Sequence, residues 1–370
     1  MNPTLKDKFD PGDLLRLSVI PGIGSKKIRT LIARFKTPAG VFKASYRELL
    51  QIEGVSKLLA TNIKKNHNDK YVSTQLDLLK KDQARIISYW DDEYPVLLKK
   101  IDDPPVLLFV KGELRQNDKK CIAIVGTRNS STYGKLVTER FARELALKDF
   151  TIVSGLARGI DTIAHKTVLS VGGNTIAVLG SSVDIIYPEE NLKLSQAITG
   201  QGAVISEFPM GTKPEAVYFP RRNRIIAGIC LATLVIEAGK KSGALITADR
   251  ALEQGRDVFA VPGNINNPKS YGCNDLIQQG AKLVRSVDDI LEEFSFATEK
   301  TKSIEERLSH IPLSKDEEKI FRLLSNEPIH IDQISEQSGL PTAQVLGVLL
   351  SLELKNLVKQ IVGKNFVRAL

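Results

Sequence analysis

The sequence has few cysteines and no long apolar run. Its three cysteines, Cys121, Cys230 and Cys273, are odd in number and lack paired spacing, so they predict neither a disulfide framework nor a metal site. We expect these thiols to lie in the core. No run of about 18 apolar residues occurs, which excludes a membrane-spanning helix. The polar N-terminal stretch MNPTLKDKFDPGDLL carries no secretory signal, so we expect a cytoplasmic protein.

The familiar catalytic signatures are also missing. The chain has no P-loop, no H-E-x-x-H, no zinc-spaced cluster of cysteine and histidine, and no G-x-S-x-G turn. The residues therefore predict no catalytic centre, no metal and no cofactor.

Acidic residues are scarce in the first part of the chain. The formal net charge is +9, and residues 1–70 hold 14 basic but only six acidic side chains. Such a local excess suits a polyanionic partner such as nucleic acid, although solvated lysines on a helical bundle give the same count. Charge alone leaves both interpretations open.

The pattern of apolar residues divides the chain into four parts. Residues 1–84 place apolar side chains at helical spacing and predict a small helical domain. Residues 85–295 predict an α/β domain, and the polar segment 296–312 predicts a linker. Residues 313–370 predict a winged helix-turn-helix domain, with two helices, a turn, a third helix and a short β-ribbon.

Short β-branched runs alternate with amphipathic helices through the α/β domain. Apolar residues at consecutive positions are typical of strands buried on both faces, so we predict an extended Rossmann-like core with a parallel sheet. Two earlier runs within 85–112 are interpreted as strands or a structured connector. The predicted core strands are 121–125, 151–153, 175–179, 203–205, 232–236 and 257–261.

A glycine-rich turn lies between two helical stretches near the N-terminus. Gly22 and Gly24 allow a sharp turn that brings backbone N–H groups to a phosphate, and Lys26 and Lys27 follow. This pattern is typical of a helix-hairpin-helix element that binds DNA without reading its sequence, and it predicts an auxiliary DNA contact. A degenerate second copy at 52–57 leaves open a purely structural pair of hairpins.

The turn after the first core strand departs from the dinucleotide fingerprint. Only Gly126 of a G-x-G-x-x-G pattern is present, followed by Thr127 and Arg128, so NAD is disfavoured. Small hydroxyl residues and an arginine at the carboxyl end of a strand suit a bare phosphate. We therefore place these three residues in a binding site.

The turn after the second core strand, SGLARGID, contains two glycines that permit a tight strand-to-helix connection. Asp161 and His165 follow at helical i,i+4 spacing, and a cap with a helix-face pair is favoured over catalysis. The site residues predicted here are Ser154, Gly155, Arg158 and Gly159.

An arginine-rich segment, FPRRNR, opens a later helix. Arg221, Arg222 and Arg224 supply forks for phosphate, with Asn223 between them, and Phe219 supplies a stacking surface. This combination is typical of proteins that bind single-stranded nucleic acid, although one or two of the arginines could instead form internal ion pairs.

A further glycine turn follows the strand at 232–236. Because the carboxyl ends of parallel strands meet at one edge of a sheet, these turns together predict an anion-binding edge. The residues assigned to the site from this turn are Lys240, Lys241, Ser242, Gly243 and Thr247.

Taken together, these motifs resemble the bacterial DNA processing protein A family, DprA, also called Smf. Any one glycine turn is a weak signal, but their joint order and spacing are specific and cover the central domain almost continuously. The matching stretches are GTR at 126–128, SGLARGIDTIAH at 154–165, TIAVLGSSVDIIYPEEN at 175–191, SEFPMG at 206–211, FPRRNRIIAG at 219–228, SGALITADRALEQGRDVFAVPG at 242–263 and GCNDLIQQGA at 272–281.

The resemblance implies a non-catalytic homodimer that binds and protects single-stranded DNA and loads the RecA recombinase during natural transformation. It also implies that Arg128 and the arginines of FPRRNR contact phosphates and that Phe219 stacks a base. Members of the family often carry an N-terminal helical domain of the sterile-alpha-motif or hairpin kind and an optional C-terminal winged helix, and this chain is expected to have both.

The predicted recognition helix of the winged-helix domain, PTAQVLGVLLSLELK, has no cation before Lys355. A helix that reads DNA needs polar and cationic side chains facing the groove. We therefore expect this domain to contact a protein, either a partner or its own dimer mate.

Two other functions remain open from the sequence. The first is a duplex-binding architectural or regulatory protein that acts through the hairpins and the winged helix. The second is a nucleotide phosphoribohydrolase-like enzyme, but the stretch from Ser242 to Ala248 lacks the carboxylate that such enzymes carry in their P-G-G-x-G-T-x-x-E motif.

Overall fold

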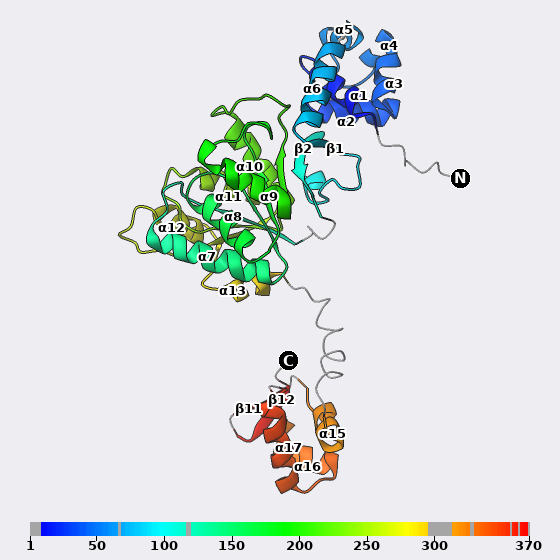
Figure 1. The fold of residues 1–370 in the computed structure, drawn as a ribbon. Coiled ribbons are helices and arrows are strands. Elements are labelled where there is room, and N and C mark those ends of the chain that lie inside the picture. Colours follow the sequence, from blue (N-terminus) through cyan, green and yellow to red (C-terminus); the bar gives the residue numbers. More distant parts are fainter. Residues whose placement is uncertain are drawn as a thin grey trace, which may run out of the picture. The chain divides into compact units, whose positions relative to one another are not determined.

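The chain forms two compact units, residues 1–290 and residues 291–370 (Figure 1). In the part of the chain that the structure covers, no helix is both long and apolar enough to cross a membrane. The predicted linker lies outside the described residues, and the predicted domain boundaries stay predictions. The computed structural model describes residues 9–65, 68–115, 120–294, 313–325, 329–355, 357–361 and 363–368.

The first part of the larger unit is helical, as predicted. Several of its helices begin at residues that cap them: the Asp10 carboxylate accepts the Gly12 N–H at 2.7 Å, and Ser45 and Glu48 form a reciprocal capping box. The helices are α1 (Pro11–Ser18), α2 (Ser25–Phe35), α3 (Pro38–Lys43), α4 (Tyr46–Leu50), α5 (Lys57–Lys65) and α6 (Asp69–Lys81).

A nine-stranded sheet follows, in the order β1-β2-β6-β5-β4-β3-β7-β8-β9. Strands β3 to β9 are parallel to one another, which confirms the Rossmann-like core, whereas β1 and β2 add an antiparallel edge beside β6. The strands are β1 (Arg85–Ser88), β2 (Leu107–Gly112), β3 (Cys121–Val125), β4 (Thr151–Ser154), β5 (Thr175–Val178), β6 (Ala203–Ser206), β7 (Ala232–Val235), β8 (Asp257–Ala260) and β9 (Lys282–Leu283).

Successive side chains of the strands divide between two hydrophobic cores. In β5, Ile176 and Val178 enter one core and Ala177 enters the other, as the period of two requires. Helices α7, α8 and α9 pack in series, and α10 packs on α11. The three cysteines are buried, as expected. The remaining helices of this unit are α7 (Thr132–Leu147), α8 (Ile160–Ser170), α9 (Leu192–Gln201), α10 (Tyr218–Ile229), α11 (Gly243–Glu253), α12 (Tyr271–Gln278) and α13 (Val287–Glu293), with short 3-10 turns η1 (Leu98–Lys100) and η2 (Glu189–Asn191).

The helical part shares a core with the sheet. Its leucines join one hydrophobic cluster with Leu107 and Phe109 of β2 and with Met210. Gln75 of α6 exchanges two hydrogen bonds with the backbone of Met210, one donated by its amide at 3.1 Å and one accepted at 2.9 Å. The helices are therefore anchored on the sheet rather than carried by a loose tether.

The smaller unit has the predicted winged-helix pattern. Gly339 ends α16 and Gly363 lies at the ribbon turn, and both have positive φ, at 66° and 84°. On α17, Leu346, Leu350 and Leu354 form an exposed apolar stripe. Its elements are α15 (Lys315–Leu323), β10 (Ile329–His330), α16 (Ile331–Ser338), α17 (Thr342–Leu354), β11 (Val358–Ile361) and β12 (Asn365–Arg368).

Glu317 of α15 links the helices of the winged-helix unit. Its carboxylate accepts hydrogen bonds from the Lys355 Nζ, the Ser314 backbone N–H and the Ser351 hydroxyl, each at 2.7 Å. These contacts, led by that of Lys355, lower the pKa of Glu317 from 4.5 to about 2. Because the pKa is depressed in the folded state, the ionised carboxylate stabilises the unit above pH 4.5, and this contribution is lost as the pH falls towards 2.

We predict that Glu317→Gln lowers the free energy of unfolding of this unit by about 2 kcal/mol at neutral pH, since it removes the charge from three hydrogen bonds. The difference from the unmodified chain should shrink as the pH is lowered. Urea titrations followed through the methyl resonances of Ile320 and Leu349 at neutral and acidic pH measure it. A difference that is the same at both pH values would contradict the role of the charge.

Candidate functional site

The candidate site is a narrow pocket at the edge of the sheet where β3, β4 and β5 end. Its volume is 40 Å³, which is room for about three water molecules or a group of similar size. The turns after all three strands contribute to it, together with the first turn of α10. The lining residues are Arg128, Gly155, Ala157, Arg158, Tyr187, Pro188 and Phe219.

The turn between β4 and α8 is held by the carboxylate of Asp161. Its Oδ2 accepts the backbone N–H groups of Gly155 at 3.0 Å and Ala157 at 3.3 Å. Burial raises the pKa of Asp161, opposed by the charge of Arg222 and by these hydrogen bonds. Gly159 has φ +72°, and a Cβ there would lie 2.3 Å from the Thr127 carbonyl oxygen. The two turns thus pack backbone against backbone.

Arg222 lies inside the protein, not on its surface. Its Nη1 donates to the carbonyl oxygens of Gly155 at 2.6 Å and Val178 at 2.5 Å, and its Nε donates to Asn223. Burial lowers its pKa to about 10, partly offset by Asp161, so it stays charged at neutral pH. In this position Arg222 positions the turn, and its guanidinium is already occupied by protein carbonyls.

Arg128 is an exposed cation of the pocket. Its guanidinium carbon lies 5.6 Å from the centroid of the Phe219 ring, within the range of a cation–π contact. Among the described residues, Arg128 forms no ion pair. The Phe219 ring also lies 5.8 Å from the ring of Tyr187. An unpaired guanidinium beside two aromatic rings can bind an anion and a flat ring together.

The other arginines of the predicted site have carboxylate partners. Arg158 forms a two-pronged pair with Glu190, at 3.0 and 2.9 Å, in which both side chains are exposed. Arg224 donates to the buried Glu207 at 2.6 Å, whereas Arg221 reaches the same carboxylate only at 3.4 Å and keeps 57% of its side chain exposed. Arg224 therefore serves as an internal clamp, and Arg221 keeps its head group accessible.

The turn after β7 does not line this pocket. The Lys240 Nζ lies 5.5 Å from the centroid of the Tyr271 ring, and Lys241 is exposed. Ser242 caps α11 by accepting the Ala244 N–H, and Thr247 is buried. Of the residues predicted in this turn, Gly243 bonds to the arginine segment, since its carbonyl accepts from Asn223 at 3.5 Å.

Predicted site residues at the ends of β3 and β4 also hold the strands together. The Thr127 N–H donates to the Glu237 carbonyl at 2.7 Å, and Ser154 Oγ donates to the Ile124 carbonyl at 2.7 Å. A Cβ at Gly126 would lie 2.5 Å from Ile160. These three predicted site residues position the turns around the pocket and do not line it.

The predicted cap and helix-face pair of Asp161 and His165 are not found in the described chain: Gly159 is the N-cap of α8, and each of the two side chains bonds elsewhere. His165 Nδ1 shares a 2.7 Å hydrogen bond with the Thr175 hydroxyl on β5. Burial, with the nearby charge of Arg222, lowers its pKa to about 3, so the imidazole is neutral.

Sequence reasoning missed three lining residues, Ala157, Tyr187 and Pro188. Ala157 lies within the predicted turn and carries no chemical signal of its own. Tyr187 and Pro188 belong to the loop after β5, whose path back over Phe219 depends on tertiary packing. An aromatic residue beside proline was the available signal.

The fold defines a Rossmann-like α/β protein with a glycine-lined, arginine-bearing pocket at its strand ends and a winged-helix unit. The chain matches the model of the DNA recombination-mediator protein A family over residues 85–295 and that of the DprA winged helix domain over residues 305–364. It belongs to the DNA recombination-mediator protein A family, as the motifs predicted.

Relatives of known name support the same assignment. Protein Smf of Escherichia coli is 41% identical over 304 residues, which cover 81% of each chain. DNA processing protein DprA of Streptococcus pneumoniae is 49% identical over 209 residues, which cover 56% of this chain and 74% of that protein.

Solved structures agree with the fold. The X-ray structure of DNA processing protein A from Streptococcus pneumoniae aligns with a TM-score of 0.69 at 37% identity, covering 78% of this chain and 100% of that one. DNA processing protein A from Helicobacter pylori, solved for its single-stranded DNA binding mode, aligns with a TM-score of 0.52 at 30% identity. The alignment covers 57% of this chain and 95% of that one.

The burial of Arg222 leads to a prediction on stability. Arg222→Met should lower the free energy of unfolding of the larger unit by about 3–5 kcal/mol, because it leaves two carbonyl oxygens and the Asp161 charge without their partner. Arg128→Met is the matched control and should change it by less than about 0.5 kcal/mol, since that side chain is exposed. Urea unfolding followed by the fluorescence of Trp90, the single tryptophan, measures both. Equal losses in the two variants would refute the distinction.

Proposed function

We propose that this protein binds single-stranded DNA without chemical turnover and hands it to the RecA recombinase during natural transformation. It acts as a homodimer in the cytoplasm. Membership of the recombination-mediator family supports the role in DNA processing. The Helicobacter pylori relative, whose structure was solved for its single-stranded DNA binding mode, supports the choice of strand.

The observation that carries the proposal is the pairing of Arg128 with Phe219. An accessible guanidinium contacts a phosphate by charge-assisted hydrogen bonds, and an aromatic ring stacks on any base regardless of sequence. The two groups are in contact at 5.6 Å, beside a turn whose backbone stands close to the pocket. Duplex DNA hides the faces of its bases, so this arrangement favours a single strand.

The arginines of the FPRRNR segment divide their roles. Arg221 adds a second accessible cation near the first turn of α10. Arg222 and Arg224 hold the first turn of α10 in place. Arg222 donates to carbonyl oxygens at the ends of β4 and β5, and Arg224 bonds to Glu207 and to the Asp103 carbonyl oxygen. Phosphate contact is thus proposed for Arg128 and Arg221, with support from the other two.

The proposed absence of turnover rests on the lining of the pocket. Its seven residues include no carboxylate and no histidine that could act as acid or base. The nearby Asp161 is committed to backbone N–H groups, and the neutral His165 is fully buried.

The hairpin glycines supply an auxiliary DNA contact in this proposal. Gly22 and Gly54 both adopt positive φ, at 87° and 79°. A Cβ on Gly54 would lie 3.9 Å from the Lys27 side chain, so the two hairpins are neighbours. Lys26 and the backbone of Gly24, where α2 begins without a side-chain cap, are exposed beside them.

Arg128→Ala should weaken the binding of an oligonucleotide of about 30 bases about tenfold and reduce the slope of log affinity against log salt by about 0.7, as for one lost phosphate contact on a single strand. Fluorescence anisotropy over a salt titration measures both quantities. Arg143→Ala, which removes an exposed arginine elsewhere on α7, is the control and should change neither.

The same titration with duplex DNA separates the competing functions. We expect the duplex to bind much more weakly than the single strand. Equal affinity for both forms, unaffected by Arg128→Ala, would favour an architectural protein acting through the hairpins. Release of free adenine from AMP would favour the phosphoribohydrolase-like enzyme and overturn the proposal.

Loading of the recombinase is tested on single strands already covered by a single-strand-binding protein. The unmodified chain should shorten the lag of RecA filament growth, followed by fluorescence of labelled recombinase, and Arg128→Ala should lose most of this effect because it cannot hold the strand. Strand binding with no effect on the lag would refute the mediator role, whereas an undiminished effect of the variant would refute the role of the pocket.

A further inference from the structure

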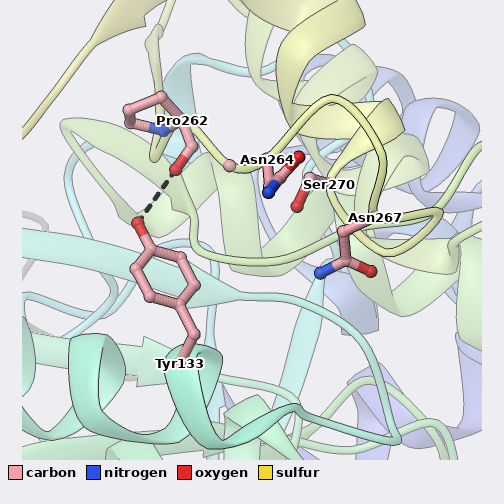
Figure 2. A pocket seen from close by; sticks show the side chains of 6 residues that line it. Tyr133, Pro262, Asn264, Asn267 and Ser270 are labelled. Carbon is pink, nitrogen blue, oxygen red and sulfur yellow. Dashed lines mark hydrogen bonds between the residues drawn. The ribbon is translucent and has the colours of Figure 1, made fainter.

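A second and larger cavity lies at the same edge of the sheet, where β7 and β8 end. Its volume of 470 Å³ is within the range of small-molecule sites. Tyr133 enters it from the first turn of α7, and the other lining residues belong to the loop between β8 and α12 (Figure 2). The lining residues are Tyr133, Pro262, Gly263, Asn264, Asn267 and Ser270.

The topology singles out this place. From β3 the chain runs to β4 on one side, whereas β7, the neighbour of β3 on the other side, leads to β8. The strand order therefore reverses between β3 and β7, and ligands of open α/β sheets bind in the crevice at such a point.

The loop fixes the polar groups of the cavity. The Oδ1 atoms of Asn264 and Asn267 accept the backbone N–H groups of Asn266 at 2.9 Å and Lys269 at 3.1 Å. These contacts set the orientation of both amides. Within the described chain, neither amide nitrogen has a hydrogen-bond partner. Two oriented donors are thus available to a ligand.

An aromatic ring stands opposite these amides. The Tyr133 hydroxyl donates to the Pro262 carbonyl at 2.9 Å, which holds the ring beside the loop (Figure 2). Tyr133 is 47% exposed although its hydroxyl is anchored. Asn274 of α12 exchanges two hydrogen bonds with the backbone of the lining residue Gly263, at 3.2 and 3.1 Å, which fixes this part of the lining.

Cations border the cavity but do not line it. Lys269 donates from Nζ to the Asn129 carbonyl at 2.8 Å, and Asn129 directly follows Arg128. Lys240 lies over the ring of Tyr271, the residue after Ser270. The centre therefore suits an uncharged group, the border suits a phosphate, and the turn after β3 is shared with the first pocket.

We propose that this cavity binds a nucleobase with its sugar. The asparagine amides donate to acceptors on the edge of the base, the Tyr133 ring stacks on its face, and the bordering lysines meet the attached phosphate. This proposal rests on the proposed function: the base belongs to the single strand held at Arg128, and that strand crosses the turn after β3. A free nucleotide offers the same chemistry, and the experiment distinguishes the two sources.

The experiment uses two variants of the full chain, one with Tyr133→Ala and one with Asn267→Ala. The control is Leu147→Ala, at the far end of α7, where the side chain is 66% exposed. Each variant is checked by thermal unfolding. With strands of about 15–20 nucleotides, both site variants should lose about tenfold in affinity, whereas Leu147→Ala should bind them as the unmodified chain does. A strand carrying 5-iodouracil should crosslink to the peptide that contains Tyr133.

The second arm titrates dAMP and dTMP alone, followed by calorimetry. Mononucleotide binding that Asn267→Ala abolishes, without any effect on long strands, would support the nucleobase site and assign it to a free nucleotide. No crosslink, no loss with long strands and no mononucleotide binding would together overturn the inference. If Arg128→Ala leaves strand binding intact, the proposed function fails at the first pocket, and the mononucleotide arm still decides the cavity.

Discussion

The buried guanidinium of Arg222 is the interaction on which the candidate site depends. One nitrogen bonds the carbonyl oxygens that follow β4 and end β5, so α10 is fixed to two neighbouring strands at once. Phe219 lies one turn earlier on the same helix and packs where Gly180 leaves room, since a Cβ there would lie 2.9 Å from the ring. The Phe219 ring is therefore held where the Arg128 guanidinium contacts it. The exposed groups of the site therefore depend on a cation that is buried in the protein.

The charge of Arg222 is balanced within the same turn. Asp161 is buried close by, and its carboxylate is held by backbone N–H groups of the segment that Arg222 bonds through a carbonyl. In this short turn, Asp161 thus accepts from the backbone N–H groups, whereas Arg222 donates to a backbone carbonyl oxygen. A turn held in this way loses little conformational freedom when a ligand arrives, which favours binding.

Much of this organisation was predictable from the sequence. Consecutive β-branched residues located the core strands, and glycine-bearing turns located the edge of the sheet where the pocket lies. The sequence patterns could not assign separate roles to the three arginines of FPRRNR, because helical spacing alone does not tell which of Arg221, Arg222 and Arg224 points inward. That depends on Glu207 and on carbonyl oxygens distant in sequence. The position of Lys240 beside Tyr271, away from the first pocket, likewise depends on how two loops pack.

The close approach of Gly155 and Arg222 also constrains how such a sequence can change over evolutionary time. A Cβ at Gly155 would lie 2.2 Å from the Arg222 guanidinium, so any side chain there collides with the arginine. Loss of the arginine first would leave the carbonyl oxygens of the turn bare. Neither position can drift alone without passing through a damaged intermediate. Substitutions at the two positions are therefore expected to have non-additive effects on stability, because the two groups are in direct contact.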